Sequence, residues 1–433
     1  MSLKLKILTR SIVLIILVGI VFITFNHKTK DDFNLIFILI DALRPDHLGC
    51  YGYYRDTSPN IDEFARKSII FTDALAQSAL TELSLKSIFL SQYVHSHNNE
   101  KIKRNSIASI LRKNGFIATA FTGGGHTNRA FGFGEDFNLY EDSHLHRSLK
   151  DINPMVIRWL KNNYNKRFFL FVHTYDVHCP YNPPELYRSM FTDKDFKPQF
   201  EIEGKCGNPY FNSLSLKTDD FKYLNALYDG GIRYADSMLR EIFDQIEFLN
   251  LSDNTIIIIA SDHGESLGER SYVGHGGIYD VQLKMTFIIK IPGFGPKVIS
   301  EPVQSIDIAP TILGLLNIKP LSTMKGVSLV PIIKGELSFN NSRLRLSQSL
   351  SSYAIRADSR WKLIFNHENN SYSFYDLDND FEEINDLSEK YRDIADDLRF
   401  KLLKIISGRS RLKINSDIYD EDLREHLRSL GYL

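Results

Sequence analysis

The chain has 433 residues, of which 43% are hydrophobic and 24% are charged, and its formal net charge at pH 7 is -1. This composition is typical of a folded globular protein and excludes a chain dominated by disorder. The near-neutral charge gives no general attraction to nucleic acid, and no basic stripe with interleaved aromatic residues indicates such a partner. The three cysteines, Cys50, Cys179 and Cys206, are too widely spaced for a zinc knuckle or a disulfide framework, although one pair could oxidise outside the cell.

The first segment of the chain, residues 1–30, has the pattern of a signal anchor. Three basic residues precede an apolar run at 12–25, whose length fits a signal peptide or a short membrane span. The residues after the run offer no cleavage site of two small residues, which favours an uncleaved anchor. We therefore expect a protein that is attached to a membrane through this segment and whose main domain is extracytoplasmic, in the periplasm or the extracellular space.

After this segment, short apolar runs alternate with helix-like stretches. The apolar runs are rich in Ile, Leu and Phe, have the length of strands covered on both faces, and lie at residues 34–40, 117–121, 168–172, 255–260 and 287–291. Helical stretches are expected at residues 107–114, 155–162 and 223–249. The alternation predicts an α/β fold with a mostly parallel central sheet flanked by helices.

A smaller region with a different pattern follows. Residues 354–364 and 372–377 resemble strands of a small antiparallel sheet, and residues 382–406 form a charged amphipathic pattern typical of a helix. We therefore divide the chain into the anchor, a catalytic domain at 31–339 and a C-terminal subdomain at 340–433.

Polar side chains follow three of the apolar runs. Asp41 ends the first run, His173 and His178 follow the third, and Asp262 and His263 follow the fourth. Because the carboxyl ends of parallel strands meet at one edge of a sheet, we expect these side chains to converge. Taken singly, each residue is more typical of a turn or of a structural histidine. As a set of oxygen and imidazole ligands, they predict a divalent metal site.

Four segments resemble motifs of the sulfatase family, within the alkaline phosphatase superfamily. Residues 34–65, NLIFILIDALRPDHLGCYGYYRDTSPNIDEFA, resemble the family's opening, and residues 81–97, TELSLKSIFLSQYVHSH, resemble its nucleophile motif and the segment after it. Residues 173–181, HTYDVHCPY, resemble its His-x-Pro-Tyr segment, and residues 261–265 with GHGGIY at 274–279 resemble its second metal motif. The resemblance covers nearly everything after the anchor and implies a metal-dependent hydrolase of sulfate or phosphate esters.

Carried over position by position, the resemblance implies roles for individual residues. Asp41, Asp262 and His263 match metal ligands, and Thr81 matches the nucleophile, whose oxygen also contacts the metal. A divalent cation at this place is therefore the implied cofactor.

The resemblance also implies substrate-binding residues. His178 and His275 match residues that contact the non-bridging oxygens of the ester or protonate its leaving group, so both are also candidate catalytic residues. Arg44 lies in the first motif, and we expect it near the substrate.

One departure from the family concerns the metal. Sulfatases commonly have two consecutive aspartates in the first motif, whereas the second position here is Ala42. The loss of one carboxylate lowers the charge and ligand count of the site, which puts the usual calcium ion in doubt. Two Asp, one His and a Thr would suit zinc or manganese as well as calcium.

A second departure concerns the nucleophile. Most sulfatases convert a Cys or Ser in Cys-x-Pro-x-Arg to formylglycine, but this chain has Thr81, Leu83 and Leu85 at the Cys, Pro and Arg positions. No formylglycine is therefore expected, and Thr81 has to attack sulfur or phosphorus directly, with help from the cation and the start of a helix. Phosphorus accepts such an attack more readily, which favours phosphate esters. Two alternatives are that Thr81 is a helix N-cap and that Ser84, at the family's own Ser position, is the reactive hydroxyl.

Three functions fit these observations. The first is hydrolysis of a sulfate or phosphate ester of a glycan, a lipid or a small molecule. The second is transfer of phosphoethanolamine or phosphoglycerol to a lipid or glycan, although such transferases usually have several membrane spans. The third is a catalytically inactive sulfatase-like binding protein, which Ala42 favours and the retained site residues oppose.

Overall fold

A computed structural model of the chain describes residues 33–94, 105–143, 148–201, 210–211, 213–338 and 343–407. The anchor predicted at 1–30 lies outside these ranges. Within them, no helix is long and apolar enough to cross a membrane.

The described part of the chain is built around an eight-stranded sheet with the strand order β11-β2-β10-β7-β1-β6-β4-β5. Only β10 runs antiparallel to its neighbours, which confirms the mostly parallel sheet predicted from the sequence. Every apolar run predicted as a strand is one. The strands are β1 (Asn34–Ile40), β2 (Ile69–Phe71), β4 (Ile117–Phe121), β5 (Leu139–Glu141), β6 (Phe168–Thr174), β7 (Thr255–Ala260), β10 (Phe287–Lys290) and β11 (Lys297–Ile299).

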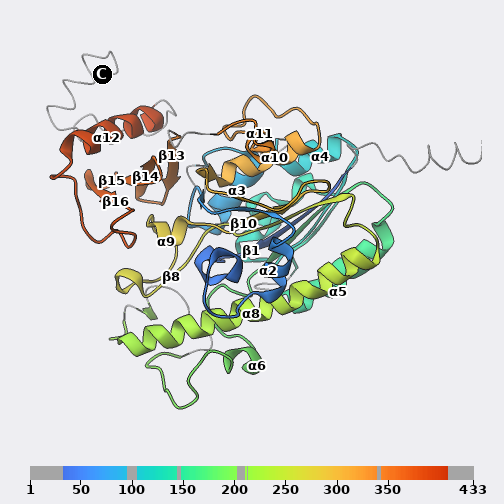
Figure 1. Cartoon of the computed structure of the whole chain (residues 1–433), viewed down its shortest axis with the longest axis horizontal. Helices are drawn as coiled ribbons and strands as arrows, with labels where there is room; N and C mark the ends of the chain where they lie inside the picture. The colour runs from blue at the N-terminus through green and yellow to red at the C-terminus, as the bar shows by residue number, and fades with distance from the viewer. Residues whose placement is uncertain are drawn as a thin grey trace, which may run out of the picture.

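Helices cover both faces of this sheet (Figure 1). One face carries α2 (Pro59–Ala65), α5 (Leu149–Asn163) and α8 (Thr218–Phe248), and the other carries α3 (Thr81–Leu90), α4 (Ile107–Lys113), α10 (Ile308–Leu315) and α11 (Val330–Lys334). Alternate residues of β1 therefore enter different cores: Phe37 packs on the side of α3, and Ile38 packs on the side of α8. Burial on both faces explains why this strand is continuously apolar.

Short elements connect the layers. They are β3 (Ala74–Leu75) paired with β12 (Val303–Gln304), the hairpin of β8 (Ser266–Leu267) and β9 (Val273–Gly274), α6 (Glu185–Arg188) and α9 (Asp280–Leu283). Turns of 3₁₀ helix lie at Pro45–His47, Gly49–Tyr51, Gly125–Thr127, Arg129–Phe131, Gly134–Asp136, Glu269–Ser271 and Ser305–Asp307.

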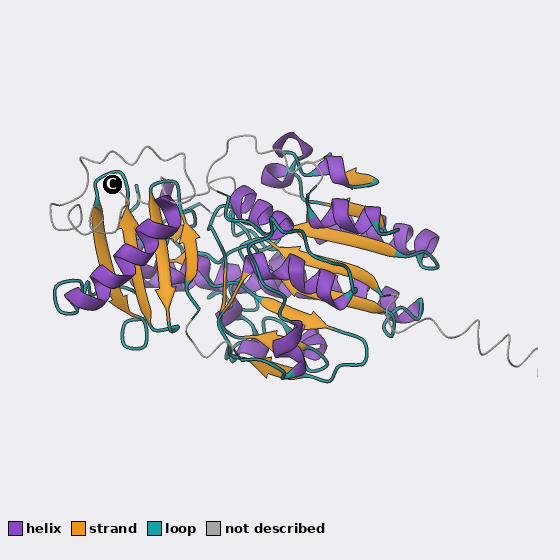
Figure 2. Cartoon of the chain, turned by 90° about the horizontal axis from the view of Figure 1, so that it is seen from above, coloured by secondary structure: helices purple, strands orange, loops and turns teal. Residues whose placement is uncertain are grey.

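The C-terminal region forms a separate antiparallel sheet of β13 (Arg345–Gln348), β14 (Ser352–Ala357), β15 (Trp361–Asn366) and β16 (Ser371–Asp376), with α12 (Arg392–Ser407) across one face (Figure 2). This agrees with the predicted sheet and helix. The boundary between residues 339 and 340 stays a prediction.

Two details of this region differ from the sequence-based expectation. Residues 354–364 are parts of two strands, because Asp358 and Ser359 adopt left-handed backbone conformations that reverse the chain. The helix predicted from residue 382 begins only at residue 392. The preceding segment is held along the sheet, because Glu383 pairs with Lys362 at 2.6 Å and Asp386 accepts a hydrogen bond from the Phe374 amide at 3.0 Å.

Candidate active site

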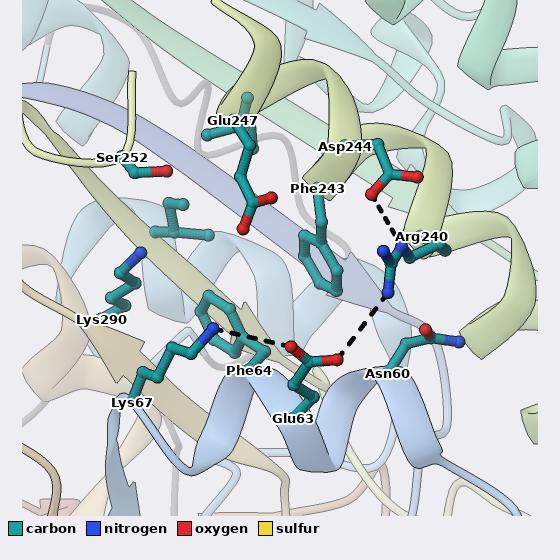
Figure 3. Close-up of a pocket in the computed structure, with 12 residues that line it drawn as sticks. Asn60, Glu63, Phe64, Lys67, Arg240, Phe243, Asp244, Glu247, Ser252 and Lys290 are labelled. Atoms are coloured by element: carbon teal, nitrogen blue, oxygen red, sulfur yellow. Dashed lines mark hydrogen bonds and ion pairs between the residues drawn. The ribbon is translucent and has the colours of Figure 1, made fainter. Parts of the chain in front are cut away.

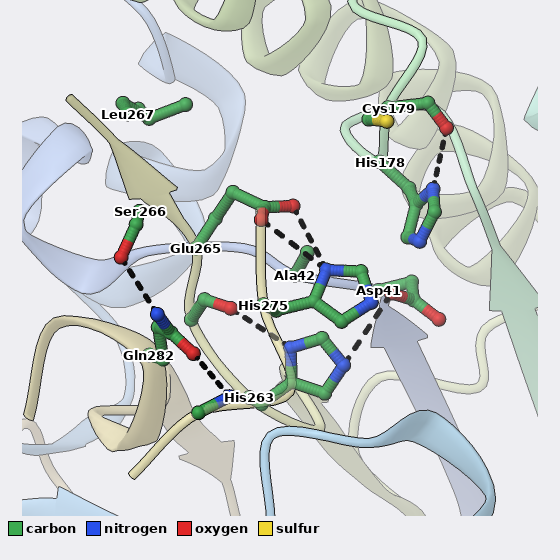
Figure 4. Close-up of polar contacts among 12 residues, drawn as sticks. Asp41, Ala42, His178, Cys179, His263, Glu265, Ser266, Leu267, His275 and Gln282 are labelled. Atoms are coloured by element: carbon green, nitrogen blue, oxygen red, sulfur yellow. Dashed lines mark hydrogen bonds and ion pairs between the residues drawn. The ribbon is translucent and has the colours of Figure 1, made fainter. Parts of the chain in front are cut away.

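The ends of β1 and β7 bring the three predicted metal ligands together. Asp41, Asp262 and His263 are completely buried, and one potential ligand atom from each lies within 4.8 Å of the others. The Nε2 atom of His263 is 3.4 Å from Asp262 Oδ2 and 3.9 Å from Asp41 Oδ1. The convergence expected from the parallel sheet is thus present in the fold, and Figure 4 shows Asp41 and His263 of this set beside His275.

The polar atoms in this cluster are suited to hold a cation. Asp41 Oδ1 and Asp262 Oδ2 have no hydrogen-bond partner among the described residues, although both are buried. Asp262 Oδ1, in contrast, accepts hydrogen bonds from the backbone amides of Ala42, at 3.2 Å, and His263, at 3.0 Å. Because a buried carboxylate oxygen without a partner is costly, the two orphaned oxygens fit a bound positive charge.

The orientation of His263 fits the same conclusion. Its Nδ1 atom is 2.8 Å from the Gly264 carbonyl oxygen, which places the proton on Nδ1 and leaves the lone pair of Nε2 facing the carboxylates. Gly264 is needed for this turn, because a Cβ atom there would lie 2.3 Å from the Val281 carbonyl oxygen. The set of donors is therefore two carboxylates and one neutral imidazole.

Burial and mutual charge set the protonation of this cluster. Burial and the nearby Asp41 carboxylate raise the pKa of Asp262 to about 8. Although burial opposes ionisation of Asp41, its contact with His173 and the charges of His178 and His263 lower its pKa below the usual value. Burial, together with the charge of His275, lowers the pKa of His263 to about 4. In the absence of a cation, one proton is thus held mainly on Asp262.

Thr81 lies against the same cluster. It is the first residue of α3, and its hydroxyl donates to Asp41 Oδ2 at 3.2 Å and lies 3.4 Å from His263 Nε2. The N-cap of α3 is Leu80, so the interpretation of Thr81 as a helix cap is wrong. The rival hydroxyl, Ser84, donates to the Asp262 carbonyl oxygen at 2.7 Å and thereby supports the loop of the metal cluster.

His275 and His178 face each other beside the cluster. The hairpin of β8 and β9 returns the chain so that the His275 ring lies 4.5 Å from the His263 ring and 4.9 Å from the His178 ring, measured between centroids. The His178 ring is fixed by a 2.5 Å contact between its Nδ1 and the Cys179 carbonyl oxygen. Both imidazoles are partly exposed, unlike the metal cluster, so they line the approach to it.

Glu265 controls the charge of His275. Both oxygens of this completely buried carboxylate are 3.2 Å from His275 Nδ1. Burial opposes protonation of His275, but the charge of Glu265 and its hydrogen bond raise the pKa of the imidazole to about 9. His275 is therefore a cation that can donate a proton through Nε2 near neutral pH. From the sequence alone, Glu265 is expected to be a supporting residue of the loop and not a catalytic acid, and its pairing with His275 is not predicted.

Arg44 is held by protein groups. Its guanidinium makes a two-bond contact with Asp46 at 3.0 and 2.7 Å, and Nη1 also donates to the Glu265 carbonyl oxygen at 3.0 Å and to Glu269 at 2.6 Å. This arrangement supports the backbone of Glu265. A direct contact of Arg44 with substrate stays a prediction.

A separate pocket lies between α2 and α8, near the amino end of β7 (Figure 3). Its volume is about 80 Å³, and the rings of Phe64 and Phe243 stack in its wall at 5.3 Å. Its charged groups pair with one another: Glu63 contacts Lys67 at 3.6 Å and Arg240 at 3.7 Å. This pocket shares no residue with the cluster at the carboxyl end of β7 and offers no set of metal ligands.

The arrangement at the sheet edge defines a class of protein: an α/β protein in which a hydroxyl, that of Thr81, faces a possible metal site. Comparisons with known proteins agree. A model of the sulfatase family matches residues 33–318, and a model described as the C-terminal part of N-sulphoglucosamine sulphohydrolase matches residues 268–408. The chain therefore belongs to the sulfatase family and is a sulfatase-family ester hydrolase.

Individual relatives are distant in sequence. An arylsulfatase of Clostridium perfringens is 23% identical over 463 residues, which cover 87% of this chain and 95% of the relative. An ulvan-active sulfatase of Formosa agariphila is 25% identical over 344 residues, which cover 70% of this chain and 65% of that protein.

Solved structures share the fold. The phosphonate monoester hydrolase of Agrobacterium radiobacter superposes with a TM-score of 0.72 at 19% identity, covering 87% of this chain and 96% of that one. A structure described as a 2-O GAG sulfatase superposes with a TM-score of 0.71 at 18% identity, covering 87% and 92%.

Proposed function

We propose that this protein hydrolyses sulfate or phosphate esters, with Thr81 as the nucleophile and one divalent cation held by Asp41, Asp262 and His263. The observation that carries the proposal is the position of the Thr81 hydroxyl, 3.2 Å from Asp41 Oδ2 and 3.4 Å from His263 Nε2. It lies beside two buried carboxylate oxygens that lack partners in the described part of the chain.

The donor set supports a metal-dependent site. A divalent cation would neutralise the carboxylates and lower the pKa of a neighbouring hydroxyl. Two carboxylates and an imidazole suit zinc or manganese, and a calcium ion would need further oxygen ligands.

Separate residues serve as the nucleophile, the proton acceptor and the proton donor. The Oγ1 atom of Thr81 attacks sulfur or phosphorus, and Asp41 Oδ2, which already accepts its hydrogen bond, is the nearest acceptor for its proton. As the bond to the ester oxygen breaks, His275 donates a proton to the leaving oxygen, because Glu265 keeps this imidazole charged. Water then hydrolyses the Thr81 ester, which releases sulfate or phosphate and restores the hydroxyl.

The surroundings favour an anionic substrate. Thr81 is the first residue of α3, a helix of 10 residues, so the partial positive charge of the helix N-terminus lies at the reacting centre. His178 and His275 lie together beside it and are placed to contact the non-bridging oxygens. The names of the relatives, which include an arylsulfatase and an ulvan-active sulfatase, support a sulfate ester as substrate. The phosphonate monoester hydrolases among the similar folds support phosphorus as an alternative centre.

We also propose that the protein works outside the cytoplasm and is attached to the membrane by residues 1–30. Support comes from the basic residues and the apolar run at 12–25, and from Cys179, which is disulfide-bonded. Disulfides persist mainly in oxidising compartments. Protease treatment of intact cells should remove the domain, and a protected, freely soluble domain would contradict this location.

The function is tested with the full-length protein and with 4-nitrophenyl sulfate and 4-nitrophenyl phosphate as substrates. We expect hydrolysis that is lost on chelation, restored by a divalent cation and absent from Thr81→Ala, while Thr81→Ser keeps part of the activity. Ser84→Ala is the matched control and should remain active. If Thr81→Ala works as well as the wild type, Thr81 is not the nucleophile. If the metal-loaded wild type releases no product from any ester, or only passes its phosphoryl group to a lipid or glycan acceptor, the hydrolase proposal fails.

A further inference from the structure

His173 is a fourth polar side chain at the metal cluster, contributed by the end of β6. It lies beside Leu39 of β1 in the register of the sheet, two residues before Asp41. The side chain is completely buried, and its Nε2 atom is 3.4 Å from Asp41 Oδ2. Its ring packs edge-on against Tyr175, with 4.8 Å between centroids.

The position of His173 requires an explanation, because an apolar side chain would suit this place better. Neither ring nitrogen has a hydrogen-bond partner of good geometry among the described residues. A buried polar group left in this state carries an uncompensated desolvation cost. Such a cost is usually retained where the group serves a bound ligand or a neighbouring charge. The neighbouring charge here is Asp41.

Two roles are open to an imidazole at this place, and the pattern of hydrogen bonds distinguishes them. A metal-binding histidine almost always donates its second ring N–H to an acceptor. His263 does so, through Nδ1 and the Gly264 carbonyl oxygen. His173 Nδ1 has no acceptor among the described residues, so His173 does not have the surroundings of a ligand. With the proton on Nε2 instead, the N–H lies 3.4 Å from Asp41 Oδ2, and only the lone pair of Nδ1 is without a nearby partner.

Ala42, which replaces the second aspartate common in sulfatases, explains why the contact between His173 and Asp41 matters. The backbone amide of Ala42 donates to Asp262 Oδ1, but its side chain carries no carboxylate that could share the cation. Asp41 therefore has to present one oxygen to the cation in a fixed orientation. Thr81 and His173 both approach Oδ2, and Oδ1 is the oxygen without a partner.

We propose that His173 is a positioning residue of the metal centre, whose Nε2–H holds Asp41 Oδ2 so that Oδ1 faces the cation. The inference rests on the metal site of the proposed function and adds a residue to it. Partners of ligating carboxylates of this kind typically contribute 10–100-fold to metal affinity or activity (about 1.4–2.7 kcal/mol).

The test measures zinc binding without any substrate. The full-length protein is stripped of metal, and its zinc affinity is determined by competition with a chromophoric chelator for the wild type, His173→Phe and His173→Gln. Phe keeps the size of the ring but loses the N–H, whereas the amide of Gln can place an N–H near the position of Nε2. Thr119→Val, an isosteric change in the adjacent strand β4, is the matched control for core packing.

We expect zinc affinity to fall about 10–100-fold in His173→Phe and to stay near the wild-type value in His173→Gln and Thr119→Val. Unfolding curves of the metal-free variants show whether each is folded, and a His173→Phe protein that fails to fold is replaced in the comparison by His173→Leu. Unchanged affinity in the apolar variants overturns the inference but leaves the proposed function intact. Equal losses in His173→Gln and His173→Phe also overturn it, since they would indicate that the imidazole binds the metal itself. A wild type that binds no zinc, manganese or calcium overturns both proposals.

Discussion

Two regions of the molecule bury several charged side chains. In one region each charge contacts an opposite charge, and in the other the carboxylates lack a Lys or Arg partner. At the seam between the C-terminal sheet and the main domain, Lys362 is completely buried and contacts Asp280 at 2.8 Å and Glu383 at 2.6 Å. Arg345, also buried, pairs with Asp73 at 2.7 Å. At the edge of the main sheet, Asp41 and Asp262 are equally buried, but no Lys or Arg forms an ion pair with either among the residues described.

The pairing of buried charges distinguishes a structural ion-pair cluster from a binding site. Buried charges that are matched by opposite charges hold parts of a fold in place, and removing one partner leaves the other uncompensated. Buried carboxylate oxygens such as Asp41 Oδ1 and Asp262 Oδ2 have no such explanation among the described residues, so they fit a cation-binding site. Single substitutions at the seam and at the sheet edge test this distinction.

The largest effect is expected from Thr81→Ala at the sheet edge. Removal of the nucleophile should lower kcat by at least about a thousandfold, because such a group is needed in every turnover. The metal cluster does not depend on Thr81 alone, so the folded protein should still take up a divalent cation. The check is steady-state hydrolysis together with metal analysis, and a variant that loses metal but keeps turnover would contradict the assignment.

A large effect of another kind is expected from Lys362→Met at the seam. The change leaves Glu383 buried without its cation and takes one of two cations from Asp280, which keeps Arg356 at 2.7 Å. It should lower the free energy of unfolding by about 3–5 kcal/mol. Denaturant unfolding measures it. The matched control is Lys401→Met, which breaks an exposed pair with Asp397 and should cost at most about 1 kcal/mol. Similar losses in both variants would show that the seam is not a special support.

The protonation of Asp262 predicts a pH dependence for the sheet edge. Its pKa is raised to about 8 in the folded, metal-free protein, from a value of 3.8 for the unconstrained side chain. Between these values the folded chain holds a proton that the unfolded chain has lost, so the stability of the metal-free protein should fall as pH rises through this window. Metal has to displace that proton, and its affinity should therefore rise about tenfold per pH unit up to pH 8.

The variant Asp262→Asn separates the effect of the Asp262 proton on stability from the effects of other titratable groups. The variant cannot hold the proton, so its metal-free stability should change less between pH 4 and pH 8 than that of the wild type, as read from thermal unfolding. A metal affinity of the wild type that does not change with pH would show that both carboxylates are already ionised in the empty site.

The smallest effect is expected from Ser84→Ala. Its hydroxyl supports the Asp262 carbonyl oxygen at 2.7 Å, so its loss should cost about 1 kcal/mol of stability. Activity should change little, because this oxygen is committed to the backbone and does not face the substrate. A loss of activity as deep as that of Thr81→Ala would make Ser84 the reactive group.

The sequence was sufficient to predict five of the eight strands of the main sheet and the convergence of Asp41, Asp262 and His263, for a physical reason. Strands buried on both faces have to be continuously apolar, so β1, β6 and β7 are visible as runs of Ile, Leu and Phe. The carboxyl ends of parallel strands meet, so Asp41 and Asp262 could be placed together before any coordinates were known.

The features that were missed depend on contacts that form only once the chain folds back on itself and that no local sequence pattern shows. Glu265 could be paired with His275 only once the β8–β9 hairpin was seen to fold back. The Arg44 guanidinium is held in part by its ion pair with Glu269, which lies more than two hundred residues further along the chain. The late start of α12 follows from the contact of Glu383 with Lys362, which outweighs the helical pattern of that segment.

The hydrogen bond from Lys362 to the Ile278 carbonyl oxygen, 2.8 Å long, ties the smaller sheet to the stretch of chain that begins at His275. A fragment ending at residue 339 would retain Asp41, Thr81, Asp262 and His263 but would lack this tether. We expect such a fragment still to bind the divalent cation but to misplace His275, the proposed proton donor. We therefore expect the smaller sheet to be needed for the position of His275, so that it cannot be exchanged freely in the manner of an independent module.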